Sequence, residues 1–404
     1  MARGESDAAR EARPGAWRER LASLVFDPRV RGIALQAVLV VAIVAFAYEI
    51  VSNVTDNLAR QQIASGFGFL ERTAGFDISQ RLIAYSNTMT YGRAFLVGLT
   101  NTLLVAGLGI VLATFIGFAV GIARLSSNAV ISSLAAIYIE VLRNIPPLLM
   151  LFAIYFAVLK GLPDPRNSVV LPFSSYINVR GLTVPKPLMA PGFDAFAIAV
   201  LIGLGLVAAL AIWSRRHRLA TGRTAPVVPL AVAILLGAPA AAYAVAGMPF
   251  TFEAPTLGRF NVTGGLTLLP ELVALTTGLT LYTAAFIAEN VRSGIEGVPK
   301  GQTEAAAALG LSRAQAMRLV IVPQALRIIV PPLTNQYLNL TKNSSLAVAI
   351  GYPDLVSVFS GTILNQTNQA IEVILITMAV YLVLSIATSL LMNWFNARMA
   401  LVER

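Results

Sequence analysis

The chain has no cysteine and one histidine among its 404 residues, and only 12% of its residues are charged. Without cysteine it forms no disulfide and no thiolate metal site, and one histidine leaves too few ligands for a zinc centre. We therefore expect no metal site and no catalytic residue. The phosphate-binding pattern Gly-x-x-x-x-Gly-Lys-Ser/Thr is also missing from the sequence, so the chain is not expected to hydrolyse ATP by itself.

Apolar residues are abundant: 56% of the chain is hydrophobic, and its mean hydropathy is +0.73. Soluble domains carry about 25% charged residues, so this composition predicts a membrane protein. A spanning helix needs about 20 apolar residues. The sequence predicts an all-α polytopic bundle of about eight transmembrane helices, at Ile33–Val51, Ala94–Ala123, Leu134–Leu159, Phe193–Trp213, Val227–Ala246, Leu266–Ala288, Ile328–Ile350 and Ala370–Trp394.

The net charge of +10 does not indicate a nucleic-acid partner, because the basic residues stand in short segments beside apolar runs. Roughly twice as many cations fall on one side of the predicted membrane as on the other, which makes that side cytoplasmic. The resulting domains are a cytoplasmic tail (1–31), a first span (33–51), a periplasmic segment (52–93), a transmembrane domain (94–395) and a cytoplasmic tail (396–404). An insertion at about 160–265 adds two helices, and the periplasmic segment either lies flat on the membrane or packs as a cap.

A polar, alanine-rich loop separates the sixth and seventh apolar runs. Residues Thr303–Leu309 are strong helix formers, with Thr303 available as N-cap, and Gly310 can adopt the left-handed conformation that ends a helix. Ser312 and Gln315 then have the spacing of a capping box. The sequence therefore predicts two short helices joined by a sharp turn, a rigid elbow suited to docking a soluble partner.

This loop resembles the EAA loop of ABC-importer permeases, whose pattern is Glu-Ala-Ala, three residues, Gly, nine residues, then apolar-x-apolar-Pro. The matching residues are Glu304, Ala305, Ala306, Gly310, Val320, Val322 and Pro323. Other segments resemble polar amino-acid permeases: Gly98–Arg124, Glu140–Tyr155, Tyr282–Arg292, Pro323–Arg327 and Leu340–Leu346. The insertion, together with Phe67–Ser79, resembles the larger permease of general L-amino-acid systems.

The resemblance implies a type I permease core in the bacterial cytoplasmic (inner) membrane, importing L-amino acids. It assigns ATPase coupling to Gly301, Gln302, Glu304, Ala305, Ala306, Gly310 and Pro323. The implied partners are cytoplasmic ABC ATPase subunits, a second permease (a heterodimer rather than a homodimer) and a periplasmic amino-acid-binding protein. The chain itself would bind no cofactor, since ATP and Mg are used by the ATPase subunits.

Polar residues inside the predicted spans are candidates for the translocation path, because ionised groups in a membrane need a partner or a wet cavity. Asn335, Asn339, Lys342 and Asn343 share one face of the seventh span, which we expect to begin at Pro331-Pro332. Thr276, Thr280 and Thr283 form a milder stripe, and the pairs Glu140–Arg143 and Glu289–Arg292 have helical i,i+3 spacing. Purely structural roles stay open for Lys342, the threonines and the Glu140–Arg143 pair. An ion-gradient-driven secondary transporter for amino acids is the alternative function, with Glu140 as its one candidate carboxylate.

Overall fold

The computed structural model describes residues 28–60, 65–189, 193–221, 227–245 and 250–399. Most of the predicted tail 1–31 and the end of the predicted tail 396–404 therefore lie outside the described residues. The chain divides into two units, Met1–Phe67 and Gly68–Arg404. The described part of the first unit is dominated by one helix, α2 (Pro28–Arg60), whose apolar side chains are exposed. This helix starts before and ends after the predicted span 33–51.

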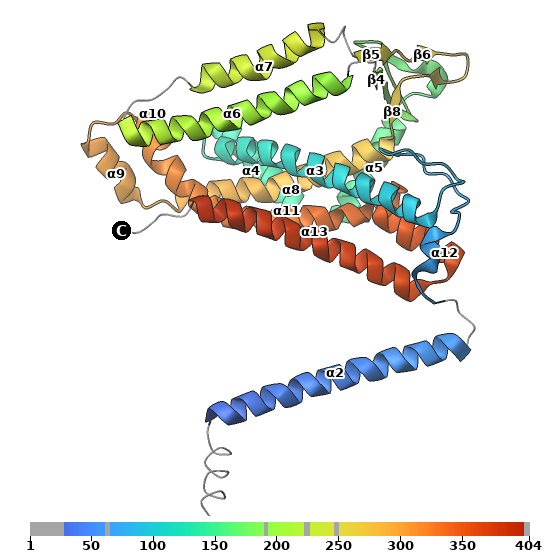
Figure 1. Cartoon of the computed structure of the whole chain (residues 1–404). Coiled ribbons are helices and arrows are strands. Elements are labelled where there is room, and N and C mark those ends of the chain that lie inside the picture. Colours follow the sequence, from blue (N-terminus) through green and yellow to red (C-terminus); the bar gives the residue numbers. More distant parts are fainter. Residues whose placement is uncertain (1–27, 61–64, 190–192, 222–226, 246–249, 400–404) are drawn as a thin grey trace, which may run out of the picture. The chain divides into compact units, whose positions relative to one another are not determined.

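The second unit consists mainly of long helices (Figure 1). They are α3 (Tyr91–Arg124), α4 (Ala129–Asn144), α5 (Pro147–Gly161), α6 (Phe193–Thr221), α7 (Val227–Val245), α8 (Pro270–Glu296), α11 (Val322–Asn343) and α13 (Ala370–Met399). The shorter turns are η1 (Phe67–Glu71), η2 (Pro165–Asn167), α9 (Lys300–Ala308), α10 (Arg313–Ala316), the π-helix η3 (Met317–Ile321), the 3₁₀-helix η4 (Ser344–Ile350), the π-helix η5 (Val356–Ile363) and α12 (Leu364–Thr367).

The insertion also contains strands, so the prediction of an all-α fold is wrong and the chain is mostly helical. A four-stranded antiparallel sheet has the order β1-β2-β3-β8, with strands Val169–Leu171, Ser175–Asn178, Gly181–Val184 and Leu266–Leu268. Two small hairpins pair β4 (Lys186–Met189) with β5 (Phe250–Glu253) and β6 (Thr256–Leu257) with β7 (Val262–Thr263). Because β8 takes up residues 266–268, the sixth span begins at Pro270 instead of Leu266.

Six of the described helices are long and apolar enough to cross a membrane, or seven if α4 and α5 are one bent span. The expected number of eight is corrected for two reasons. The third predicted span is broken by 110° between α4 and α5, since Pro146 and Pro147 force the residue before them out of the helical region. The apolar part of α7, Pro229–Val245, is shorter than the others, and Ala246 of that predicted span lies outside the described residues.

The centre of the second unit is the contact between α3 and α8, which small residues bring close together. A Cβ on Gly117 would lie 2.5 Å from Cγ2 of Ile287, and one on Gly121 would lie 2.7 Å from the carbonyl oxygen of Ala288. Both positions increase together along the two helices, so α3 and α8 run in the same direction. The end of α3 near Arg124 therefore lies beside the end of α8 that leads into α9.

Residues 68–90 form a packed structure. Within the cap (residues 68–90), Phe69, Ala74, Ile78 and Tyr85 are buried, and they share a core with Leu355 and Phe359 of the later chain. Of the two arrangements left open for the predicted segment 52–93, residues 68–90 show the packed one, because an amphipathic segment lying on a membrane would not bury these side chains within the protein. Residues 52–60 continue helix α2 instead.

Candidate functional site: an exposed elbow and a polar helix face

The elbow (Lys300–Ala316) consists of the short helices α9 and α10 and the turn between them. Gly310 has φ +78, as predicted for a residue that ends a helix. The amide of Gly310 donates to the carbonyl of Ala307 (2.9 Å), and that of Leu311 donates to Ala306 (3.1 Å), which is the Schellman arrangement. Together these bonds satisfy the last carbonyls of α9 and fix the angle at which the chain leaves it.

The second arm of the elbow is capped as the sequence predicted. The Gln315 amide donates to Oγ of Ser312 (3.4 Å), and the Ser312 amide donates to Oε1 of Gln315 (2.9 Å). The first arm differs, because α9 begins at Lys300 with Pro299 in the cap position and no side-chain cap. Thr303 therefore lies inside α9, and its prediction as N-cap is wrong. Pro299 suits this place because its fixed φ is compatible with a helix start.

The predicted coupling residues are mostly exposed. Gly301, Gln302, Glu304 and Ala305 are exposed on α9, whereas Ala306 is buried. Nε2 of Gln324, on α11, donates to Oε1 of Gln302 (3.1 Å) and links α9 to the following span. Gly310 is exposed at the turn, and Pro323 is an exposed residue near the start of α11.

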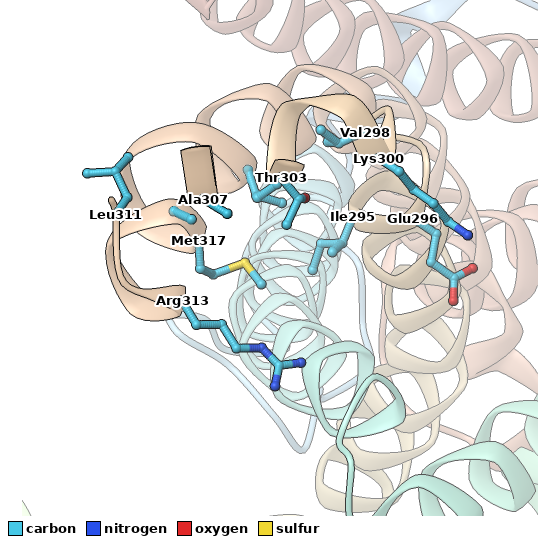
Figure 2. A pocket seen from close by; sticks show the side chains of 11 residues that line it. Ile295, Glu296, Val298, Lys300, Thr303, Ala307, Leu311, Arg313 and Met317 are labelled. Carbon is cyan, nitrogen blue, oxygen red and sulfur yellow. The ribbon is translucent and has the colours of Figure 1, made fainter. Parts of the chain in front are cut away.

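A cavity of about 770 Å³ lies behind the elbow, between α9, α10 and the end of α8. Figure 2 shows the side chains that line it. Its lining includes apolar Ile295, Val298, Leu311, Met317 and Ile321, with charged Glu296, Lys300 and Arg313. Thr303 and Ala307 of α9 line this cavity, while Ala306 of the same helix is buried against the protein.

The polar residues of α11 share a face of the helix that no other described part of the chain covers completely. Asn335, Asn339 and Lys342 are exposed and Asn343 is half-buried, while Leu333, Leu340 and Thr341 of the same helix are buried. Within the described part of the chain, none of the four polar side chains has a hydrogen bond or an ion pair. Pro331 and Pro332 lie inside α11, which begins at Val322, so the prediction that they open this helix is wrong.

The other path candidates lie elsewhere. Thr276 and Thr280 are buried on α8, and their hydroxyls have no hydrogen-bond partner among the described residues. Glu140 and Arg143 are exposed on α4 but do not pair with each other, and the Arg143 guanidinium lies 5.4 Å from the ring centre of Phe286 instead. Among the described residues, none of these four side chains has a hydrogen bond or an ion pair with the polar residues of α11.

The predicted pair Glu289–Arg292 is formed, with 2.6 Å between Nη2 and Oε1, and Arg292 also binds Glu296. Sequence reasoning missed a buried polar group around Asp354, a carboxylate that is fully buried between two apolar clusters. The signal was present, since Asp354 is the one charged residue in the apolar run from Leu346 to Phe359.

Known proteins resemble this chain in sequence over most of its length. The family model described as "Binding-protein-dependent transport system inner membrane component" matches residues 109–401. The General L-amino acid transport system permease protein AapQ of Rhizobium johnstonii is 55% identical over 382 residues, covering 95% of each chain. The putative amino-acid ABC transporter permease protein YhdX of Escherichia coli is 50% identical, covering 94% of this chain and 96% of the relative.

A third relative is the glutamate/glutamine/aspartate/asparagine transport system permease protein BztB of Rhodobacter capsulatus. It is 39% identical over 419 residues, covering 95% of this chain and 97% of the relative. Among solved structures, one described as "Crystal structure of an amino acid ABC transporter with histidines" has a TM-score of 0.45 and 22% identity, and covers 76% of this chain and 95% of its own.

Proposed function

The chain belongs to the family of binding-protein-dependent transport system inner membrane components, and from this premise we propose that it is the permease subunit of an ABC importer for L-amino acids. Members of this family are multi-span proteins of the bacterial inner membrane and are not themselves ATPases. The observation that carries the proposed cargo is the 55% identity to a general L-amino-acid permease over 95% of both chains. An ion-driven secondary transporter is no longer needed as an alternative.

We place ATPase coupling at the elbow. Its α9 arm exposes small residues, Gly301 and Ala305, beside one carboxylate, Glu304. Small side chains let a groove of a partner approach the helix backbone closely, and Glu304 supplies a charged anchor. The Schellman turn and the capping box hold both arms at a fixed angle, which suits an element that transmits motion from an ATPase subunit using ATP and Mg. In this proposal the elbow and both termini face the cytoplasm.

The polar face of α11 supports a path enclosed between two permeases of type I fold. An ionised side chain at mid-membrane costs about 2.5–3.5 kcal/mol on insertion scales, and Lys342 is exposed without a partner in the described chain. A second permease, related to this one, would cover that face and enclose a wet channel in which Lys342 meets a carboxylate and Asn335, Asn339 and Asn343 offer amides. Thr276 and Thr280 would stand behind this face, and Glu140 and Arg143 would lie nearer the elbow.

The partners that complete the importer are a pair of cytoplasmic ATPase subunits and a periplasmic binding protein that delivers the amino acid. The experiment is uptake of radiolabelled L-amino acids in cells that carry the chain with its neighbouring transport genes. Glu304→Lys should abolish uptake while the protein remains in the membrane at its normal level, because the charge of the anchor is reversed. Glu253→Lys, an exposed carboxylate of β5, is the matched control and should transport normally. Unchanged uptake by Glu304→Lys would refute the coupling role.

A further inference from the structure

Asp354 is a fully buried carboxyl in the connecting segment (Gly351–Gln369), which follows the candidate span ending at Ile350 and precedes the one beginning at Ala370. Its neighbours belong to different hydrophobic clusters. Tyr352 packs with the main core of α3, α8 and α11, whereas Leu355 packs with the cap residues Phe69 and Tyr85. Asp354 therefore stands at the seam between the cap and the transmembrane core.

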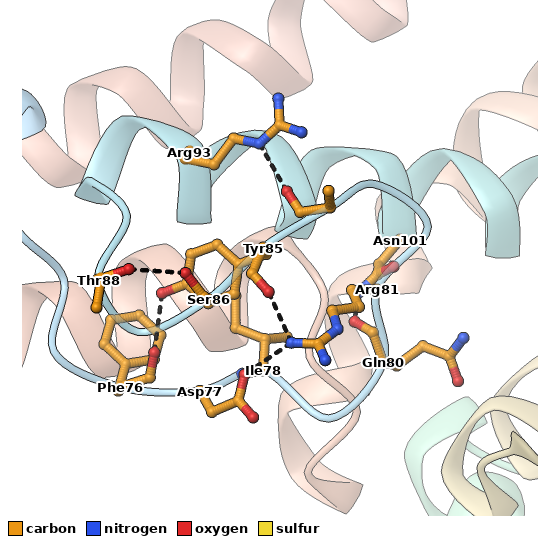
Figure 3. A network of polar contacts seen from close by, with 11 residues as sticks. Phe76, Asp77, Ile78, Gln80, Arg81, Tyr85, Ser86, Thr88, Arg93 and Asn101 are labelled. Carbon is orange, nitrogen blue, oxygen red and sulfur yellow. Dashed lines mark hydrogen bonds and ion pairs between the residues drawn. The ribbon is translucent and has the colours of Figure 1, made fainter. Parts of the chain in front are cut away.

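Two neighbouring residues of α3, Asn101 and Thr102, form hydrogen bonds at this boundary between the cap and the transmembrane core. Nδ2 of Asn101 donates both to the carbonyl of Gln80 in the cap (2.7 Å) and to that of Pro353 (2.8 Å), and Figure 3 shows Asn101 beside this part of the cap. Oγ1 of Thr102 accepts from the amide of Leu355 (3.0 Å). One turn earlier, a Cβ on Gly98 would lie only 3.0 Å from Cα of Leu355. The cap and the connecting segment are thus held on the same stretch of α3.

This seam and the elbow lie at opposite ends of α3. Gly98 touches Leu355, while Gly121 touches the part of α8 that leads to α9. The stretch between the two glycines corresponds to roughly 35 Å at 1.5 Å per residue. In the proposed importer, the cap would therefore be at the side from which the amino acid arrives, and this placement rests on the proposed function.

The carboxyl of Asp354 is incompletely hydrogen-bonded: the amides of Ser357 and Val356 and the hydroxyl of Tyr381 favour its charged form, but burial outweighs them. Oδ1 accepts from the amide of Ser357 (2.8 Å), but Oδ2 is buried with no hydrogen-bond partner among the described residues. The hydroxyl of Tyr381, from α13, lies next to this carboxyl and is also without a bond of good geometry in the described structure. An unpaired buried carboxylate oxygen is costly, whereas a protonated one can donate to a neighbouring oxygen.

No cation among the described residues offsets the charge of Asp354. Of the three arginines in or next to the cap, Arg72 is exposed. The other two are bound elsewhere, as Figure 3 shows: Nη1 of Arg81 donates to Asp77 (3.1 Å) and to the carbonyl of Tyr85 (2.7 Å), and Nε of Arg93 donates to that of Ala84 (2.9 Å). The titratable groups that face Asp354 are the phenols of Tyr352 and Tyr381, while α3 and η4 present only amide and hydroxyl groups. Burial raises the pKa of Asp354 from its ordinary range to about 7.

We propose that Asp354 is a positioning residue that holds the cap closed on α3 when its Oδ2 carries a proton, and that loss of this proton loosens the seam. The neutral carboxyl fits a buried site, while the carboxylate is stabilised by water that reaches it only when the cap lifts. The direction follows from linkage. The pKa is higher in the closed form than in water, so closure is favoured at low pH and this advantage is lost as the pH rises to 7.

The absence of cysteine allows a direct test in the full-length protein in membranes. Ala74→Cys places a thiol in the buried part of the cap, and Glu71→Cys places one at an exposed position of the same cap. The ratio of their maleimide labelling rates reports cap opening and removes the intrinsic effect of pH on thiols. We expect this ratio to rise between pH 5 and pH 7, by up to about tenfold per pH unit, and to level off above pH 7.

Asp354→Asn, which cannot ionise, should keep the ratio low and flat across the range. The control Asp164→Asn, an exposed carboxyl without a side-chain hydrogen bond, should behave as the parent chain. Two outcomes overturn the proposal. One is a labelling ratio that does not change with pH when Asp354 is intact, a result that stands even if Asp354→Asn fails to insert. The other is a rise of the ratio with pH that persists in Asp354→Asn. Amino-acid uptake is not the readout, so failure here leaves the proposed function intact, and failure of uptake leaves this result interpretable.

Discussion

Gly310→Ala is the sharpest test of the elbow as a rigid docking element. Gly310 has φ +78, and a Cβ there would meet nothing within 4 Å, so the substitution introduces backbone strain without a steric clash. The left-handed conformation costs a residue with a Cβ roughly 1–2 kcal/mol. We expect the unbound Gly310→Ala turn to relax out of the left-handed conformation. If the ATPase subunit recognises the two arms at the angle that this turn sets, docking must restore the strained conformation, and the docking free energy weakens by up to that cost.

A loss of about 1–2 kcal/mol corresponds to roughly 5- to 30-fold weaker binding. The assay is the Kd of the purified ATPase subunit for the permease in detergent, together with amino-acid uptake. The matched control is Gly205→Ala, which is also an exposed glycine with no atom within 4 Å of a new Cβ, but which lies inside α6 and outside the elbow. Alanine is favoured over glycine in a helix, so binding of the ATPase subunit should be unchanged.

Gly310→Asn should fall between the two, because asparagine tolerates the left-handed region better than alanine does. The ordering of the variants is therefore part of the prediction. If Gly310→Ala binds the ATPase subunit as tightly as the parent chain, then α9 is recognised without regard to the turn, and the argument for a rigid elbow fails.

Three further predictions concern the bundle and the path. Gly121→Ala should lower the stability of the detergent-solubilised protein by about 1–3 kcal/mol, because its Cβ would lie 2.7 Å from a carbonyl oxygen of α8. The control Gly107→Ala has open space around the new Cβ and should not lower it. Thermal unfolding of the two variants and the parent chain measures the difference. Thr102→Val should cost about 1–3 kcal/mol by leaving the buried amide of Leu355 unpaired, measurable in the same assay. Lys342→Met should raise the substrate concentration for half-maximal uptake if Lys342 lines the path; reduced protein abundance with unchanged affinity would contradict that role.

The two Pro-Pro pairs have opposite effects on the helices that contain them, which the sequence did not predict. At 145–147 the chain leaves the helix at Ile145 and turns by 110°, whereas at 330–332 the helix continues through both prolines. An interior proline costs about 3 kcal/mol, so the second case requires compensation. On α11, Ile329, Val330 and Leu333 are buried on both sides of the pair, and this continuous packing holds the helix axis. Neither outcome can be read from the dipeptide alone.

The elbow was predictable because its determinants are local. Gly310, Ser312 and Gln315 act within a few residues of themselves, and the structure has the turn and the capping box where the pattern predicts them. The start of α9 was misplaced by a few residues, since Pro299 and Thr303 both offer plausible starts and propensity alone does not choose between them. The pairings of β3 with β8 and of β4 with β5 were missed because the partners lie far apart in sequence, which periodicity does not report. The locally paired strands β1, β2, β6 and β7 have only two to four residues each, too few to show an alternating pattern.

The sequence by itself determined the class of the protein, the positions of most apolar helices and the form of the elbow. These depend on composition, on runs of about 20 residues and on caps, all of which are local properties of the chain. Tertiary structure alone decided which polar side chains are buried and which of them are paired. Asp354 is buried, Lys342 is exposed and Glu140 does not meet Arg143, because the surroundings of each side chain are set by elements that are distant in sequence and brought against it by packing.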